Sequence, residues 1–237
     1  MLVLPVLPRR HQPEVMDQPG LDPRLHRQAL AGLRRINFWG RSAGILWPPL
    51  AAAARAVGPR PLRVLDLASG GGDVPIRLWH KARRAGLPIV VAGCDVSPVA
   101  VEHAAGEAKR RRAEVRFFQA DAFDDELPAG YDAVVCSLFL HHLTEDQAAG
   151  LLRRMAAAAG RLVLVNDLVR NRPGLLMAWV ATRLLSRSPV VHVDGPRSIQ
   201  GAFTVEEARG LAERAGLSGA TVERRWPCRF LLTWVRS

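Results

Sequence analysis

Three consecutive glycines at positions 70–72 constrain this chain more than any other feature, because they separate a strand pattern from a helix pattern. Residues 64–67 form an apolar run that contains one acid, Asp66, as is typical of a buried strand, and residues 74–85 have helical spacing. Glycine tolerates positive φ and lets a ligand approach the main chain where a Cβ atom would block it. The start of a helix also presents unpaired N–H groups. This arrangement predicts a site for an adenosine-containing cofactor.

The spacing of the glycines separates two classes of cofactor. Dinucleotide folds use Gly-x-Gly-x-x-Gly, whose third glycine lets the helix and strand pack closely. Here Gly70 and Gly72 are followed by Pro75, so the third glycine is missing. Asp66 would lie badly beside a pyrophosphate, but it suits a cofactor that carries an amino group and a sulfonium. A glycine turn without any ligand remains the alternative.

These residues resemble the first motif of the class I S-adenosylmethionine-dependent methyltransferases, roughly Asp/Glu-x-Gly-x-Gly-x-Gly. Asp66, Gly70 and Gly72 match, and Ala68 replaces the first glycine. The resemblance covers roughly residues 62–165 and implies a Rossmann-like three-layer α/β/α sandwich. Its sheet would have seven mainly parallel strands, with one antiparallel strand in a closing hairpin. The resemblance also implies that Asp66, Ala68 and the glycine backbone hold the methionine part of S-adenosylmethionine.

Two further acids stand at the ends of strand patterns. Asp95 ends the second apolar run, and Asp121 follows the third. Two adjacent ribose hydroxyls ask for a bidentate acceptor such as Asp95, in either Rossmann-like class. The resemblance implies that Asp121 accepts a hydrogen bond from the adenine amino group, that the backbone near Ala122 reads the ring, and that Val96 lines the same site. Alternatively, Asp121 only caps the short turn that follows it.

A histidine pair, His141 and His142, follows the fourth strand pattern at residues 131–137. A neutral imidazole can take the proton of a hydroxyl or phenol near pH 7. A His-His-Leu turn is also common in small-molecule methyltransferases, where it often shapes the cofactor pocket. We expect His141 to be the more solvent-exposed residue and the candidate general base. His142 is expected to be structural and, like Ser137, to line the cofactor site.

The fifth strand pattern ends at Asn166 and Asp167, which raises the question of a metal. Catechol-type methyltransferases bind Mg²⁺ through such a pair together with an Asp after strand four. The corresponding residue here is Ser137, so the set lacks one hard oxygen ligand and no metal is expected.

Residues 170–202 are the candidate substrate lid, because such enzymes build lids between strand five and the last helix. An apolar helix at 173–185 carries Trp179, and the stretch 188–198 shows little periodicity. Trp179 is expected to contact an apolar substrate, while Asp194 or His192 meets its polar end. His192 is a second candidate base. The alternative is a packed surface helix followed by an Asp-Gly turn.

The sequence as a whole predicts three regions, namely a flexible tail at 1–20, a helical cap at 21–60 and one domain at 61–237. The second cap helix, near residues 42–57, should be interrupted by Pro48 and Pro49. Four helix starts can be read from capping pairs, namely Asp22 with Pro23, Ser97 with Pro98, Thr144 with Gln147, and Thr204 with Glu207.

The net charge is +11, and nearly all of the positive charge is arginine, since only Lys81 and Lys109 are lysines. This composition is typical of a GC-rich coding bias and does not favour nucleic acid, although a functional basic surface stays open. Three widely spaced cysteines predict a reducing, cytoplasmic setting without a disulfide frame or a zinc site. No segment is expected to span a membrane, and peripheral contact with one is left open.

The sequence therefore predicts an S-adenosylmethionine-dependent methyltransferase acting on a small, apolar acceptor at oxygen or carbon. The chain resembles bacterial ubiquinone and menaquinone methyltransferases, which implies a phenolic, quinol or polyketide-like acceptor. Three alternatives remain: an RNA-modifying methyltransferase, an NAD-dependent oxidoreductase and a non-catalytic cofactor-binding protein. The acceptor and the oligomeric state cannot be read from the sequence.

Overall fold

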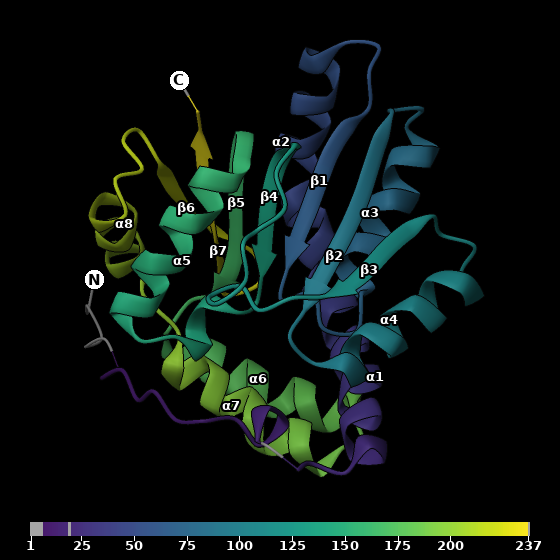
Figure 1. Ribbon diagram of the computed structural model, residues 1–237. Coiled ribbons are helices and arrows are strands. Elements are labelled where there is room, and N and C mark those ends of the chain that lie inside the picture. The colour runs from purple at the N-terminus through teal and green to yellow at the C-terminus, as the bar shows by residue number, and fades with distance from the viewer. Residues whose placement is uncertain (1–6, 19, 237) are drawn as a thin grey trace.

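A seven-stranded sheet organises the computed structural model, which describes residues 7–18 and 20–236 (Figure 1). The strands are β1 (Leu62–Leu67), β2 (Ile89–Asp95), β3 (Val115–Gln119), β4 (Tyr131–Ser137), β5 (Ala159–Leu168), β6 (Thr221–Arg225) and β7 (Arg229–Val235). They lie in the order β3-β2-β1-β4-β5-β7-β6. Strand β7 pairs antiparallel with both β5 and β6, while the pairs among β1 to β5 are parallel. The predicted sheet and its closing hairpin are confirmed, with β6 rather than β7 at the edge.

Helices cover both faces of this sheet, as the three-layer prediction requires. The helices are η1 (Val15–Asp17), α1 (Pro23–Trp39), α2 (Ser42–Val57), α3 (Asp73–Arg84), α4 (Pro98–Arg110), η2 (Leu140–His142), α5 (Glu145–Ala158), α6 (Arg172–Leu185), α7 (Pro189–Gly201) and α8 (Val205–Arg214). In β1, Val64 packs with α2 and α3, whereas Leu65 and Leu67 pack with α5 and α8. This alternation follows from the two-residue period of a strand. All four predicted helix caps are present.

Helix α2 runs without interruption through Pro48 and Pro49, so the predicted break is wrong. A proline inside a helix removes a backbone hydrogen bond and costs about 3 kcal/mol. The buried side chains of Leu46, Leu50 and Ala54 offset this cost against the core. Burying one leucine contributes roughly 1.5–3 kcal/mol. Tertiary packing therefore overrides the local preference of the two prolines.

The stretch at 188–198 is also more regular than its pattern indicates, because it belongs to helix α7. Asp194 and Gly195 lie inside this helix, so the alternative of an Asp-Gly turn is wrong. Pro189 occupies the first turn, where proline is tolerated. The buried residues Val190 and Ile199 hold the helix in place.

Helices α1, α6 and α7 lie together below the carboxyl ends of the parallel strands (Figure 1). The segment before α1, which we expected to be a flexible tail, makes specific hydrogen bonds within its described part. Arg170 Nε donates to Leu7 O at 2.6 Å, and Arg9 Nε donates to Gly201 O at 2.7 Å. These partners lie far along the chain, so no local pattern could show them. Residues 1–6 and 19 of the predicted tail lie outside the described part.

Within the described ranges, none of the helices has both the length and the apolar character needed to cross a membrane.

Candidate active site

The glycine turn after β1 has the backbone conformation that its sequence predicts. Ala68, Gly70 and Gly72 have φ of 51°, 51° and 74°. A Cβ atom on Gly72 would lie 2.7 Å from Cζ of Phe117 and 2.8 Å from Cβ of Ala104. Both the positive φ and the close packing therefore require glycine at position 72. Ala68 keeps the turn in a conformation that an alanine adopts only at some energetic cost.

Asp66 is a buried carboxylate beside this turn, with 1 % of its surface exposed. Its Oδ1 atom has no hydrogen-bond partner among the described residues. Burial, together with the nearby acids Asp73 and Asp95, raises the pKa of Asp66 well above its ordinary value. An unpaired buried carboxyl is costly unless a ligand satisfies it. The site therefore fits a cationic group, such as the amino group of a methionine moiety.

A second buried acid, Asp73, begins helix α3 directly after the glycines. Burial raises the pKa of Asp73 to about 6, even though the hydrogen bond from Asn37 and the charge of Arg77 act to lower it. Asn37 Nδ2 lies 3.3 Å from Asp73 Oδ1. Our sequence prediction missed both residues. An acid directly after three glycines was a readable signal, whereas nothing local links Asn37 to it.

Helix α1 covers the glycine turn as well as supplying Asn37. A Cβ atom built on Gly71 would lie 3.5 Å from Cβ of Leu30, which is on α1. Arg34, on the same helix, forms an ion pair with Glu107 of α4 at 2.8 Å. The first cap helix therefore lies over the candidate cofactor site, whereas α2 packs into the core on one face of the sheet.

The carboxylate of Asp95 is held by the backbone of the glycine turn. Asp95 Oδ2 accepts from Gly70 N at 2.8 Å, and Oδ1 accepts from Ser97 N at 3.0 Å. A carboxylate offers two acceptor oxygens, which is the arrangement that two adjacent hydroxyl donors require. The structure thus brings Asp66, Asp95 and the glycines together at one sheet edge, as predicted.

Asp121 lies next to this group. The residue before it, Ala120, donates from its backbone N to Asp95 O at 3.1 Å. Its Oδ1 accepts from Phe123 N at 2.7 Å, so Asp121 does cap the turn that follows it. This capping uses one of the two carboxylate oxygens. Ala122 is buried, whereas Val96 is 59 % exposed beyond Asp95.

The ends of β4 and β5 carry a second polar cluster. Ser137 and Asn166 are paired in register, and Asn166 Nδ2 donates to Ser137 Oγ at 2.8 Å. His141 Nδ1 lies 2.6 Å from Asp167 Oδ1. The side chain of His141 is 5 % exposed and that of His142 is 18 % exposed. Our expectation that His141 is the more solvent-exposed histidine is wrong, because Asp167 holds it inside.

The pKa of His141 is strongly shifted by these neighbours. Burial by itself lowers it, but the charges and hydrogen bonds of Asp167 and Glu14 outweigh burial and raise it to about 10. His141 is therefore an imidazolium at neutral pH. In this form it cannot accept a proton from a substrate.

Glu14 comes from the N-terminal segment and closes this cluster. Its Oε1 lies 3.7 Å from His141 Nε2, and its Oε2 lies 3.9 Å from His142 Nε2. Ser198 Oγ donates to Glu14 Oε1 at 2.5 Å. The three possible ligand atoms lie within 4.8 Å of one another, close enough to surround a cation. Among the described residues, Glu14 is the group that links the two histidines.

The three residues predicted for the lid have separate contacts. His192 Nε2 lies 2.8 Å from Ser186 O, which ties this residue of α7 to the end of α6. The carboxylate of Asp194 accepts from Val15 N and Met16 N at 2.9 and 3.0 Å. Trp179 is half-exposed on α6. Within the described part of the chain, the contacts of these three residues do not bring them together.

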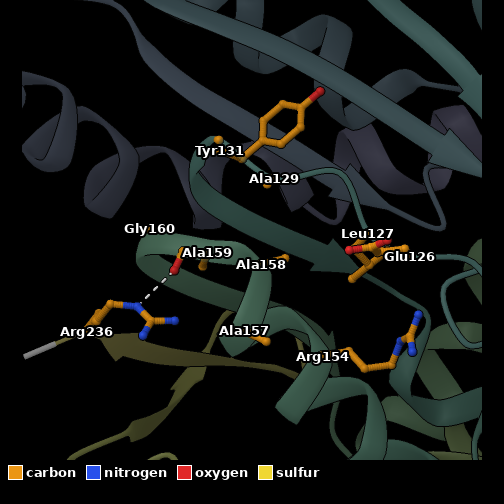
Figure 2. A pocket seen from close by; sticks show the side chains of 11 residues that line it. Glu126, Leu127, Ala129, Tyr131, Arg154, Ala157, Ala158, Ala159, Gly160 and Arg236 are labelled. Atoms are coloured by element: carbon orange, nitrogen blue, oxygen red, sulfur yellow. Dashed lines mark hydrogen bonds between the residues drawn. The ribbon is translucent and has the colours of Figure 1, made fainter.

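An open hollow of about 580 Å³ lies at the other end of the parallel strands, away from their carboxyl ends (Figure 2). It adjoins the starts of β4 and β5 and is lined by residues that include Tyr131, Arg154 and Arg236. Arg236 Nε donates to Ala159 O at 3.0 Å, as the dashed line in Figure 2 shows. None of the predicted site residues lines this hollow.

Comparison with known proteins agrees with this geometry. Residues 64–160 match the family described as methyltransferase domain. A demethylmenaquinone methyltransferase of Thermus thermophilus is 38% identical over 107 residues, which are 44% of this chain and 47% of that protein. The chain therefore spans about half the length of this curated relative. An uncharacterised methyltransferase of Mycobacterium tuberculosis is 32% identical over 177 residues, or 72% of this chain and 85% of that protein.

A solved structure shares the fold at low sequence identity. The magnesium protoporphyrin IX methyltransferase of Synechocystis PCC 6803 with bound SAH has a TM-score of 0.58 and 19% identity, and the match covers 94% of this chain and 91% of that one. This likeness shows the fold. The family is shown by the relative that is 32% identical and matched over 85% of its length, in agreement with the family match at residues 64–160, so the chain belongs to the methyltransferases.

Proposed function

We propose that this protein transfers the methyl group of S-adenosylmethionine to a small apolar acceptor. The observation that carries the proposal is the buried carboxyl of Asp66, whose Oδ1 is unpaired among the described residues and lies beside the glycine turn. The bound cofactor would supply a methyl group on a sulfonium, which is already an excellent leaving group. The binding residues therefore need to recognise positive charge, and a dinucleotide would bring the opposite charge.

We assign each cofactor contact to a residue at the carboxyl edge of the sheet. Asp66 and Asp73 would bind the amino group, because both are buried acids with an oxygen left unpaired among the described residues. Asp95 would accept the ribose hydroxyls and Asp121 the adenine amino group. The exposed side chain of Val96 would lie against the nucleoside. The backbone of the glycine turn and Ala122 would complete the contact.

The contribution of the chain to the reaction is mainly positioning. Because the sulfonium is already a good leaving group, the main remaining requirement for transfer is to hold the acceptor in line with the methyl group. Helices α1, α6 and α7 lie beyond the strand ends, where they can exclude water from such a site (Figure 1). His141 can serve as a base only when neutral, which requires either alkaline pH or a weaker contact with Glu14. His192 remains the second candidate.

For the acceptor, we propose a phenolic, quinol or polyketide-like molecule methylated at oxygen or carbon. The name of the Thermus thermophilus relative refers to a quinone. The aromatic side chain of Phe139, which follows β4 at this end of the molecule, suits a flat hydrophobic substrate. Asp194 would meet the polar end of that substrate only if the N-terminal segment released it.

Cofactor specificity is tested first, by thermal unfolding of the whole chain with S-adenosylmethionine, S-adenosylhomocysteine or NAD⁺. We expect the two sulfur nucleosides to raise the unfolding temperature and NAD⁺ to leave it unchanged, because ligands stabilise the state they bind. The Asp66→Asn variant should lose this stabilisation. Stabilisation by NAD⁺ alone, or an unaltered response of Asp66→Asn, would contradict the proposal.

The acceptor is tested by transfer of a labelled methyl group to a panel of phenols, quinols, amines and RNA. We expect label in phenols or quinols and none in RNA. Label in RNA, with binding that falls steeply as salt rises, would favour the RNA-modifying alternative. Cofactor binding without transfer to any class on the panel would favour a non-catalytic cofactor-binding protein.

A further inference from the structure

Helix α6 exposes its large apolar side chains to solvent, which is the reverse of an ordinary surface helix. Leu176, Trp179, Val180 and Leu184 are 66%, 50%, 38% and 78% exposed. Their spacing of three and four residues places them on one side of the helix. We call these four residues the α6 stripe. An exposed apolar face of this kind marks an interaction site.

The opposite side of α6 explains why the stripe faces outward. The buried residues of this helix are Gly174 and Thr182, which are both small. Helix α7 approaches so closely that a Cβ atom on Gly195 would lie 2.3 Å from Cγ2 of Thr182. The packing against α7 thus uses the small residues of α6, and within the described part of the chain it leaves the α6 stripe exposed to solvent.

The charged residues on α6 and directly beside it in the sequence all have one sign. Between Arg170 and Arg187 the charged residues are all arginines, and Arg172, Arg183 and Arg187 are exposed. Arg183 also lies 4.2 Å from the ring centre of Trp179. Arginine stems can lie along an apolar surface while the guanidinium reaches phosphate. Tryptophan likewise suits a boundary between hydrocarbon and water.

We propose that the α6 stripe docks the protein on an anionic lipid bilayer. The helix has 14 residues, so it would lie in the interface and would not cross it. A symmetric pair of two copies through the same stripe is disfavoured, because it would bring the arginines of both copies face to face. Anionic headgroups would neutralise those arginines. The proposal does not depend on methyl transfer, since vesicle binding is measured without an acceptor.

The test is co-sedimentation of the full chain with phosphatidylcholine vesicles, with and without phosphatidylglycerol. We expect pelleting with phosphatidylglycerol that weakens as salt rises, and little pelleting without it. The double variant Leu176→Gln/Leu184→Gln should bind at least about tenfold more weakly. The control Val90→Gln/Val235→Gln changes two apolar residues that are 50% and 64% exposed on strands, and it should bind like the wild type.

Two further measurements separate the roles of charge and insertion. Arg172→Gln/Arg187→Gln should weaken binding to phosphatidylglycerol vesicles by about fivefold per arginine. Lipids brominated on their acyl chains should quench the fluorescence of Trp179, so the quenching should fall in Trp179→Phe. Circular dichroism and unfolding temperature check that each variant is folded.

Several results would overturn the proposal. The first is a wild type that remains in the supernatant with phosphatidylglycerol vesicles at low salt. The second is a Leu176→Gln/Leu184→Gln variant that pellets to the same extent as the wild type. The third is an equal loss of binding in the Val90→Gln/Val235→Gln control. Light scattering could show a dimer that Leu176→Gln/Leu184→Gln converts to a monomer, in which case the stripe is an interface between copies of this chain.

Discussion

The Nδ1 atom of His141 lies 2.6 Å from Oδ1 of Asp167, and both side chains are almost completely buried. Asp167 also accepts from His141 N at 3.3 Å and from Leu168 N at 2.6 Å. Three donors from two segments thus converge on one carboxylate at the end of β5. Burial raises the pKa of Asp167, but His141 outweighs burial and holds this pKa below its ordinary value.

The pair predicts how stability depends on pH. The pKa of His141 in the folded protein is about 10, above its ordinary value of 6.5. The stability that it contributes is therefore fully present below about pH 6.5 and is lost as the pH rises through about 10. We expect the free energy of unfolding to fall between pH 7 and pH 10, measured by urea denaturation. His141→Gln should flatten this part of the curve, and an equal fall in both proteins would rule out the assignment.

Removing the carboxylate from this pair should be more damaging than removing the histidine. Asp167→Asn leaves His141 as a buried cation with a weaker partner, and breaking a buried pair in this way typically costs about 3–5 kcal/mol. His141→Gln leaves Asp167 with its two backbone donors. We expect Asp167→Asn to lower the urea midpoint further than His141→Gln does. The reverse order would show that the histidine carries the network.

The pH dependence of methyl transfer tests whether His141 is a base. A base works only when it is deprotonated, so its contribution to the rate should rise with pH up to about 10. Glu14→Gln removes one of the charges that raise the pKa of His141, so the rise should move to lower pH. A rate that is flat between pH 6 and pH 9 in both proteins would show that transfer needs no proton acceptor at His141. His192→Gln is the matched variant for the second candidate.

Asp66 and Asp95 should respond in opposite ways to neutralisation. Asp66→Asn removes a buried carboxyl with a raised pKa, so the ligand-free protein should become more stable at pH 7. Affinity for S-adenosylmethionine should fall roughly 10- to 100-fold, since a hydrogen bond to a charged group contributes about 1.5–3 kcal/mol.

Asp95→Ala should instead lower both stability and affinity, because Gly70 N and Ser97 N lose their acceptor. Calorimetric binding and thermal unfolding of the two variants provide the comparison. Unchanged cofactor affinity in Asp95→Ala would show that the ribose assignment is wrong.

Two glycines separate backbone strain from steric overlap. Gly72 and Gly86 have φ of 74° and 63°, but a Cβ atom at Gly86 meets no atom within 4 Å. Gly86→Ala should therefore cost only the strain of positive φ, about 1–2 kcal/mol. Gly72→Ala adds the overlap with Phe117 and Ala104, so we expect roughly 2–5 kcal/mol in urea denaturation. Equal costs would mean that the turn relaxes around the added methyl group.

The order of strands and helices could be predicted because it depends on short-range patterns. Thr144 with Gln147 and Thr204 with Glu207 form the capping boxes that their spacing predicts. The prolines of α2 and α7 were misleading, since burial of neighbouring side chains outweighs a local preference of a few kcal/mol. Such burial depends on residues far away in the chain.

By itself, the sequence determined where the strands end and therefore where Asp66, Asp95 and Asp121 meet. Parallel strands place their carboxyl ends at one edge, so three local patterns suffice to predict this part of the site. Only the tertiary structure decided that Asn37 reaches Asp73 and that Glu14 closes over the histidine pair. It also decided that α6 turns its apolar side chains outward. The physical reason is that pKa values and exposure depend on through-space neighbours, which the order of residues does not reveal.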